Sequence, residues 1–115
     1  MPYFLFQWTY KDPAVKAMLE SPQDRPEELR KAVEGFGGKL HQFFYAFGEY
    51  DGIAITEFPN NESCAACSLM LSGAGGATAL RTTVLLSAEE GQGAMRKARI
   101  AKTGYQPPVG YSSHG

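Results

Sequence analysis

The sequence predicts an α+β fold in which one four-stranded antiparallel sheet is built in the order β-α-β-β-α-β. An aromatic run free of Gly and Pro occupies residues 3–10. Two more strand-like runs at 39–47 and 52–58 are separated by only a few residues, and apolar residues recur at helical spacing within 27–36. In this ferredoxin-like plan both crossover helices cover the same face of the sheet, so the other face is left open.

The first strand and the helices that follow it have clear boundary signals. Residues 3–10 (YFLFQWTY) suit a pleated, buried strand because aromatic side chains are enriched there. The run ends where Asp12 can cap a helix and Pro13 can occupy its first turn, which predicts a short helix through Leu19. A second helical segment is expected from Glu27 to Phe36, and its apolar stripe should lie on the sheet. That stripe consists of Leu29, Ala32, Val33 and Phe36.

The runs 39–47 and 52–58 must form an antiparallel hairpin, because the connection between them is short. Two tight turns fit the residues between them. Gly48-Glu49 could form a type II′ turn and Asp51-Gly52 a type I′ turn, and the sequence does not choose between them.

The second half repeats the pattern of helix and strand. Asn60 or Asn61 can cap a helix over about 62–72, and a fourth strand is expected at 79–86. Ser87 and Glu90 then form a plausible capping box for a last helix that extends to about Ile100. These elements predict one domain over residues 1–101, followed by an extended or flexible tail over 102–115.

The composition is that of a soluble globular protein, with 43% hydrophobic and 20% charged residues. A formal net charge of -1 provides no field that would attract nucleic acid or an anionic membrane. No run approaches the roughly 18 apolar residues that span a bilayer, and the N-terminus lacks the features of a signal peptide. Two cysteines cannot form the disulfide framework of a small secreted domain. We therefore expect a cytoplasmic protein that binds neither membrane nor nucleic acid.

The first two strands carry more aromatic side chains than one sheet face can bury. They hold nine of the fourteen aromatic residues, on both faces of each strand. Burial of a large side chain contributes roughly 1.5–3 kcal/mol, so exposing several of them would forfeit much of the stability of a small domain. The sequence therefore predicts a homodimer, or a higher homo-oligomer, in which two sheets pack face to face.

Polar residues within or beside these strands are candidate ligand-binding or catalytic groups. His41 is expected on the same side as Phe43 and Tyr45, where it could act as a general base or simply pack. Gln7, Tyr45 and Arg81 are candidate ligand-binding residues. Arg81 could hold an anion in bidentate fashion or pair with Glu57.

Tyr50 and Asp51 lie at the end of the predicted hairpin, where a phenol and a carboxylate could both reach a ligand. The alternative is structural: Asp51 accepts backbone N–H bonds in the turn while Tyr50 packs over the hairpin.

Cys64 and Cys67 have the spacing of a redox dithiol, and a helix N-terminus would lower the pKa of the Cys64 thiol. The alternative is that both are small buried residues that let the helix lie close to the sheet. A metal site would need further ligands, which His41 and His114 do not obviously provide. Neither a metal nor a cofactor is therefore expected.

The segment Gly48-Glu49-Tyr50-Asp51, set between Tyr45-Ala46-Phe47 and the run 53–59, resembles the GYD-domain family, whose name comes from its Gly, Tyr and Asp. The resemblance extends over about residues 1–100 and implies a ferredoxin-like, dimeric α/β-barrel. It implies no particular reaction, substrate or cofactor, because the family is largely uncharacterised. Glu49 separates the Gly from the Tyr-Asp pair here, and Cys64 and Cys67 lie outside the motif.

Two functions are open at this stage. The first is a homodimer that binds a small apolar or aromatic compound in a barrel cavity and acts as a cofactor-independent enzyme on it. The second is a non-catalytic oligomerisation or interaction module, whose apolar sheet face serves only for self-association.

Overall fold

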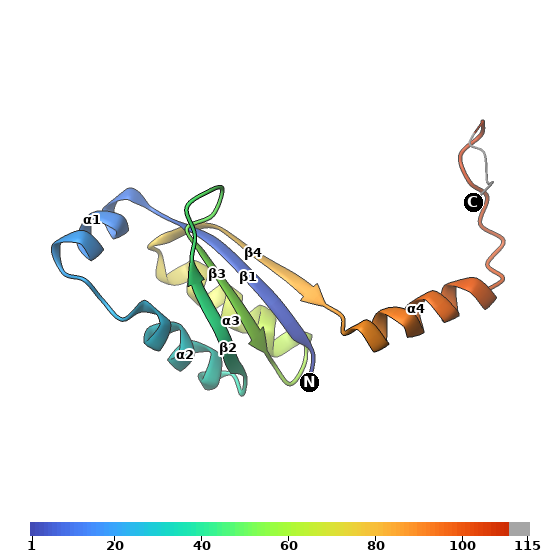
Figure 1. Cartoon of the computed structure of the whole chain (residues 1–115), viewed down its shortest axis with the longest axis horizontal. Coiled ribbons are helices and arrows are strands. Elements are labelled where there is room, and N and C mark those ends of the chain that lie inside the picture. Colours follow the sequence, from blue (N-terminus) through green and yellow to red (C-terminus); the bar gives the residue numbers. More distant parts are fainter. Residues whose placement is uncertain (111–115) are drawn as a thin grey trace.

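A computed structural model describes residues 1–110 and shows a four-stranded sheet with two helices packed on one face (Figure 1). The elements in chain order are β1 (Tyr3–Tyr10), α1 (Asp12–Glu20), α2 (Arg25–Gly35), β2 (Lys39–Tyr45), β3 (Gly52–Glu57), α3 (Asn61–Ala74), β4 (Ala77–Leu85) and α4 (Ala88–Ile100). The strand order is β2-β3-β1-β4, and each neighbouring pair is antiparallel. The predicted ferredoxin-like α+β fold is confirmed. Within residues 1–110 no helix is both long and apolar enough to cross a membrane.

The helix starts follow the capping residues of the sequence with one exception. The Asp24 side chain accepts from the Glu27 N–H at 3.2 Å, and the Asn60 side chain accepts from the Ser63 N–H at 2.8 Å. Ser87 and Glu90 form the predicted capping box of α4. The prediction that Asp12 caps α1 is wrong, since Asp12 is the first helical residue and the cap position makes no side-chain hydrogen bond. Its carboxylate still lies in the first turn, where the helix dipole favours negative charge.

The hairpin between β2 and β3 has neither of the two predicted tight turns. β2 ends at Tyr45, two residues earlier than predicted, and the loop closes with a 2.8 Å hydrogen bond from the Ala46 N–H to the Asp51 carbonyl. Neither Gly48 nor Gly52 has the positive φ that a type II′ or type I′ turn requires. The physical reason is that hydrogen bonds between the loop and β1, and not bonds within a tight turn, determine the conformation of the loop.

The core lies between the sheet and the helices α2 and α3. β1 contributes Phe4, Phe6 and Trp8, which are 2%, 0% and 6% exposed. The Thr56 hydroxyl, the one buried polar side chain of the described core, donates to the Phe4 carbonyl at 3.2 Å. The helices add Leu29, Val33, Cys64 and Cys67. The predicted apolar stripe of the second helix therefore does face the sheet.

The opposite face of the sheet, here called the open sheet face, is covered by no helix of residues 1–110 (Figure 1). Leu5 of β1 lies at its centre, paired with Ile55 on one side and Thr83 on the other. The neighbouring row pairs Gln7 with Ile53 and Arg81. Further apolar side chains complete the face: Tyr3, Phe44 and Leu85.

The last helix stands away from the sheet (Figure 1). α4 runs over Ala88–Ile100 as predicted and contains no buried residue. Residues 102–110 contain no helix or strand and are all exposed. His114 lies outside the described residues.

Candidate functional site

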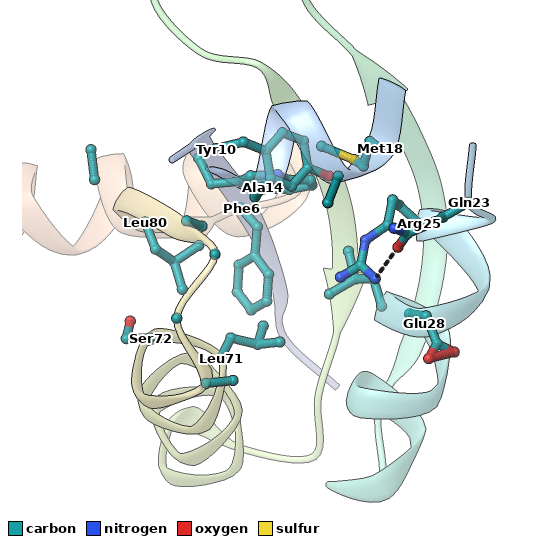
Figure 2. Close-up of a pocket in the computed structure, with 18 of the residues that line it drawn as sticks. Phe6, Tyr10, Ala14, Met18, Gln23, Arg25, Glu28, Leu71, Ser72 and Leu80 are labelled. Atoms are coloured by element: carbon teal, nitrogen blue, oxygen red, sulfur yellow. Dashed lines mark hydrogen bonds between the residues drawn. The ribbon is translucent and has the colours of Figure 1, made fainter. Parts of the chain in front are cut away.

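A cavity of about 450 Å³ lies between the helix-covered face of the sheet and the ends of three helices (Figure 2). Its floor is aromatic and comes from two strands: Phe6, Trp8 and Tyr10 of β1 and Phe43 of β2. The Trp8 ring contacts two of the others, with centroids 5.4 Å apart for Trp8 and Phe43 and 6.3 Å apart for Trp8 and Tyr10. The floor is therefore a continuous apolar surface.

Small residues around this floor leave the space open. Ala14 and Ala17 of α1 and Ala77 of β4 face the cavity where larger side chains would fill it. Gly75 and Gly76 have φ of 79° and 86°, which is the left-handed region that favours glycine, and they turn the chain sharply along the cavity wall.

A bulge in β4 shapes the same wall. The register passes from Gln7–Arg81 to Thr9–Thr78, so two residues, Ala79 and Leu80, stand opposite Trp8. Ala79 has a φ of 50°, which is uncommon for a residue that carries a Cβ. Both Ala79 and Leu80 line the cavity. Such backbone strain collects at ligand sites more often than elsewhere.

The side of the cavity formed by the start of α2 is polar. Arg25, Gln23 and Glu28 line it, and Arg25 Nη1 donates to Gln23 Oε1 at 3.3 Å (Figure 2). Tyr45 lies beside the aromatic floor, with its ring centroid 5.2 Å from that of Phe43. Desolvation by burial, with a smaller effect of Tyr10, raises the pKa of the Tyr45 hydroxyl. The cavity thus has an apolar body and one polar side.

Three of the candidate residues lie on the open sheet face instead, across the sheet from the cavity. Gln7 and Arg81 are direct partners in the β1–β4 ladder. His41 Nε2 lies 2.8 Å from Glu57 Oε1, and its ring stacks on Tyr3 with centroids 5.1 Å apart. Arg81 makes no ion pair within the described residues, so the predicted alternative of an Arg81–Glu57 pair is wrong: Glu57 pairs with His41.

The prediction that His41 shares a side with Phe43 and Tyr45 is also wrong. The β2–β3 register passes from Leu40–Thr56 to Gln42–Ile55, so His41 is an extra residue in a β-bulge. The bulge interrupts the alternation of sides. His41 therefore faces Tyr3 on the open sheet face, while Phe43 contacts Trp8 on the other.

The sequence matches the GYD domain over residues 4–95, from β1 through most of α4. The chain belongs to the GYD domain family. A comparison with curated proteins finds no match. The GYD match therefore confirms the resemblance seen in the sequence and includes the strands, the hairpin loop and the cavity floor.

In the Tyr-Asp pair of this GYD domain, Asp51 joins the hairpin loop to β1. Asp51 Oδ2 accepts from the Tyr10 N–H at 2.9 Å, and the Asp51 N–H donates to the Trp8 carbonyl at 2.9 Å. Asp51 does accept a backbone N–H, but from β1 and not from its own turn. Tyr50 is half-buried beside it. Neither residue lines the cavity, although both partners of Asp51 do.

Both cysteines of the GYD domain are buried and free, with Cys64 2% and Cys67 0% exposed. Burial raises the pKa of each thiol to about 11. The prediction that the helix N-terminus lowers the pKa of Cys64 is wrong, because desolvation of the thiolate outweighs the helix dipole here. The geometry favours the structural alternative. Residues 1–110 contain no cluster of three or more metal-ligating side chains.

The cavity was not predicted from the sequence. The aromatic strands suggested a ligand space on the face of the sheet that the helices leave open, whereas the cavity lies on the helix-covered face. None of the candidate residues lines the cavity; Tyr45 contacts Phe43 of its floor, and Asp51 is hydrogen-bonded to Trp8 and Tyr10. The alanines of the first helix and the Gly75-Gly76 pair could have indicated the cavity, because their small side chains leave space beside the aromatic strands. Their positions around one space become visible only once the chain is folded.

Proposed function

We propose that this GYD domain is a homodimeric binding protein for a small apolar or aromatic compound, which occupies the cavity on the helix-covered face. The observation that carries the proposal is an aromatic floor under about 450 Å³ of space, a volume within the range of ligand pockets. Polar groups on one side would orient the ligand. We propose binding and assign no reaction to the lining residues.

The homodimer part of the proposal rests on the open sheet face. Leu5, Ile53 and Ile55 lie at its centre with no helix above them, and Phe44 at its edge is 55% exposed. Contiguous apolar patches of this kind on soluble proteins generally mark interaction sites. A second copy offers the same self-complementary face across a two-fold axis.

Ligand binding is tested by titrating the full chain with the neutral compound cuminyl alcohol. Trp8 is the single tryptophan of the chain and lines the cavity, so its fluorescence reports occupancy, and calorimetry gives the stoichiometry. We expect saturable binding at one site per chain. Ala14→Phe should fill the cavity and weaken binding by about tenfold or more, the equivalent of about 1.4 kcal/mol.

The matched control is Ala65→Phe, which adds the same volume at an exposed position of α3 outside the cavity. It should bind as the parent does. Absence of saturable binding, or equal weakening by both substitutions, would overturn the proposed ligand site.

Dimerisation is tested by analytical ultracentrifugation. The parent should sediment at twice its 12.5 kDa mass, and Ile55→Glu should shift it toward the monomer by placing a charge at the centre of the open sheet face. Leu19→Glu is the control, since Leu19 is 78% exposed on α1. A parent that is monomeric at micromolar concentration would contradict the homodimer.

The second candidate function, a non-catalytic oligomerisation or interaction module, is favoured by the same open sheet face. The two candidates give different results in these experiments. A dimer that is disrupted by Ile55→Glu and shows no saturable uptake of cuminyl alcohol would establish the module. A dimer that takes up the probe supports the binding protein.

A further inference from the structure

Arg25 places a positive charge on the polar side of the cavity. Its side chain is half-buried at the first turn of α2, and it lines the cavity together with the aromatic floor. Its one hydrogen bond within the described residues is the 3.3 Å contact with the neutral amide of Gln23. No carboxylate of residues 1–110 forms an ion pair with it.

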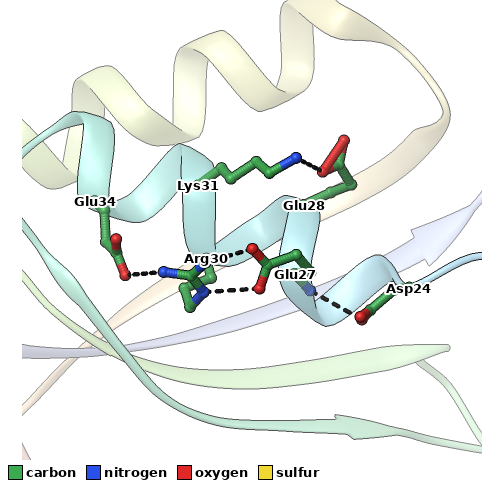
Figure 3. Close-up of polar contacts among 6 residues, drawn as sticks. All are labelled: Asp24, Glu27, Glu28, Arg30, Lys31 and Glu34. Atoms are coloured by element: carbon green, nitrogen blue, oxygen red, sulfur yellow. Dashed lines mark hydrogen bonds and ion pairs between the residues drawn. The ribbon is translucent and has the colours of Figure 1, made fainter.

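The other two cations of α2 are neutralised by carboxylates on the same helix (Figure 3). Arg30 pairs with both Glu27 and Glu34, the latter at 2.7 Å from Nη1. Lys31 Nζ lies 2.8 Å from Glu28 Oε2. Glu28 also lines the cavity; its hydrogen bond with Lys31 and, to a smaller extent, the charge of Arg25 lower its pKa, but its ion pair is with Lys31. Of the three cations of α2, Arg25 is the one that forms no ion pair within residues 1–110, so its guanidinium is available to a ligand in the cavity.

The apolar and the polar lining residues of the cavity lie on opposite sides, an arrangement that suits a molecule with one apolar end and one charged end. In Figure 2, Leu71, Leu80 and Phe6 gather on one side and the Arg25–Gln23 pair lies on the other, with open space between. A guanidinium presents paired N–H donors that match the two oxygens of a carboxylate. A half-buried cation gains more from such a partner than an exposed one, because water screens it less.

We propose that the cavity selects an apolar or aromatic compound that carries a carboxylate, and that Arg25 is the residue which determines this preference. This inference rests on the proposed ligand site. The ring of the ligand lies over the aromatic floor, and its carboxylate meets the guanidinium of Arg25 in place of the Gln23 amide.

Three compounds of the same shape test it by calorimetry on the full chain: cuminate, cuminyl alcohol and cuminylamine. The parent should bind cuminate about tenfold or more tighter than the alcohol, as charge-assisted hydrogen bonds of this kind require, and the cationic amine most weakly. Arg25→Gln should remove the preference, so that the ratio of the affinities for cuminate and cuminyl alcohol falls to about one within this variant. Arg25→Lys should keep part of the preference, because a point charge lacks the paired donors.

Arg30→Gln is the matched control, since it removes the same charge from the same helix at a residue that does not line the cavity. It should leave the preference unchanged. Equal affinities for cuminate and cuminyl alcohol in the parent, or a preference that survives both substitutions of Arg25, would overturn this inference and leave the proposed function standing. Failure of all three compounds to bind the parent would overturn both.

Discussion

Asp51 Oδ2 accepts a hydrogen bond from the backbone N–H of Tyr10 at 2.9 Å, across forty-one positions of the sequence. The bond joins the loop between β2 and β3 to the last residue of β1. Since Tyr10 also lines the cavity, the Asp of the family motif supports the cavity without being part of its wall. The conformation of the hairpin loop and the shape of the site are thus connected.

Removing this acceptor should destabilise the domain. Asp51→Ala leaves the half-buried Tyr10 N–H without its partner, which costs about 1–3 kcal/mol of unfolding free energy. Asp51→Asn keeps an acceptor oxygen and should cost less. Urea unfolding followed by Trp8 fluorescence measures both. Glu49→Ala removes an exposed carboxylate from the same loop and serves as the control; equal destabilisation by Glu49→Ala and Asp51→Ala would show that the hydrogen bond has no special role.

Gly52→Ala should disturb the cavity floor. A Cβ at this buried position would lie only 2.8 Å from Trp8 Nε1, with other indole atoms closer still, so the ring must move. We expect a loss of about 1–3 kcal/mol from overpacking, together with a shifted emission maximum of Trp8. Gly48→Ala is the matched control, because a Cβ there meets nothing within 4 Å. An unchanged emission spectrum in Gly52→Ala would contradict the packing described.

The buried thiols predict how stability changes with pH. Both pKa values rise from 9.0 to about 11 on folding, so between these values the folded protein holds protons that the unfolded chain releases. Stability therefore falls as the pH rises through this window. Urea unfolding at several values of pH should show a steeper fall for the parent than for the double variant Cys64→Ala/Cys67→Ala. Identical pH slopes would show that the thiols are not responsible.

Ser87→Ala should weaken α4 without destabilising the sheet. The substitution removes the capping box and costs the helix about 1 kcal/mol, but α4 buries none of its residues. We expect lower helicity over 88–100 in NMR chemical shifts and an unchanged unfolding free energy of the domain. Asn60→Ala, which removes the cap of the packed helix α3, should lower that free energy. If Ser87→Ala lowers it equally, α4 is packed against something in solution.

Local signals in the sequence were sufficient for most elements. Residues 3–10 form β1 as predicted, and the Ser87–Glu90 box starts the last helix, because strand and capping preferences act over a few neighbouring residues. The places where prediction was wrong involve partners that are distant in sequence. The hairpin loop depends on Asp51 meeting Tyr10, and the side that His41 faces depends on a bulge in the pairing of β2 with β3.

The α+β plan, the order of its elements and the apolar stripe on the second helix can be predicted from the amino-acid sequence, since these follow from periodicities of two and 3.6 residues. The folded chain is needed to see that the cavity lies under the helices, that Arg25 lines it, and that Gln7, His41 and Arg81 face the other way. The reason is that a cavity is the volume left unfilled among side chains from six elements, and bulges in β2 and β4 change which side chains point toward it.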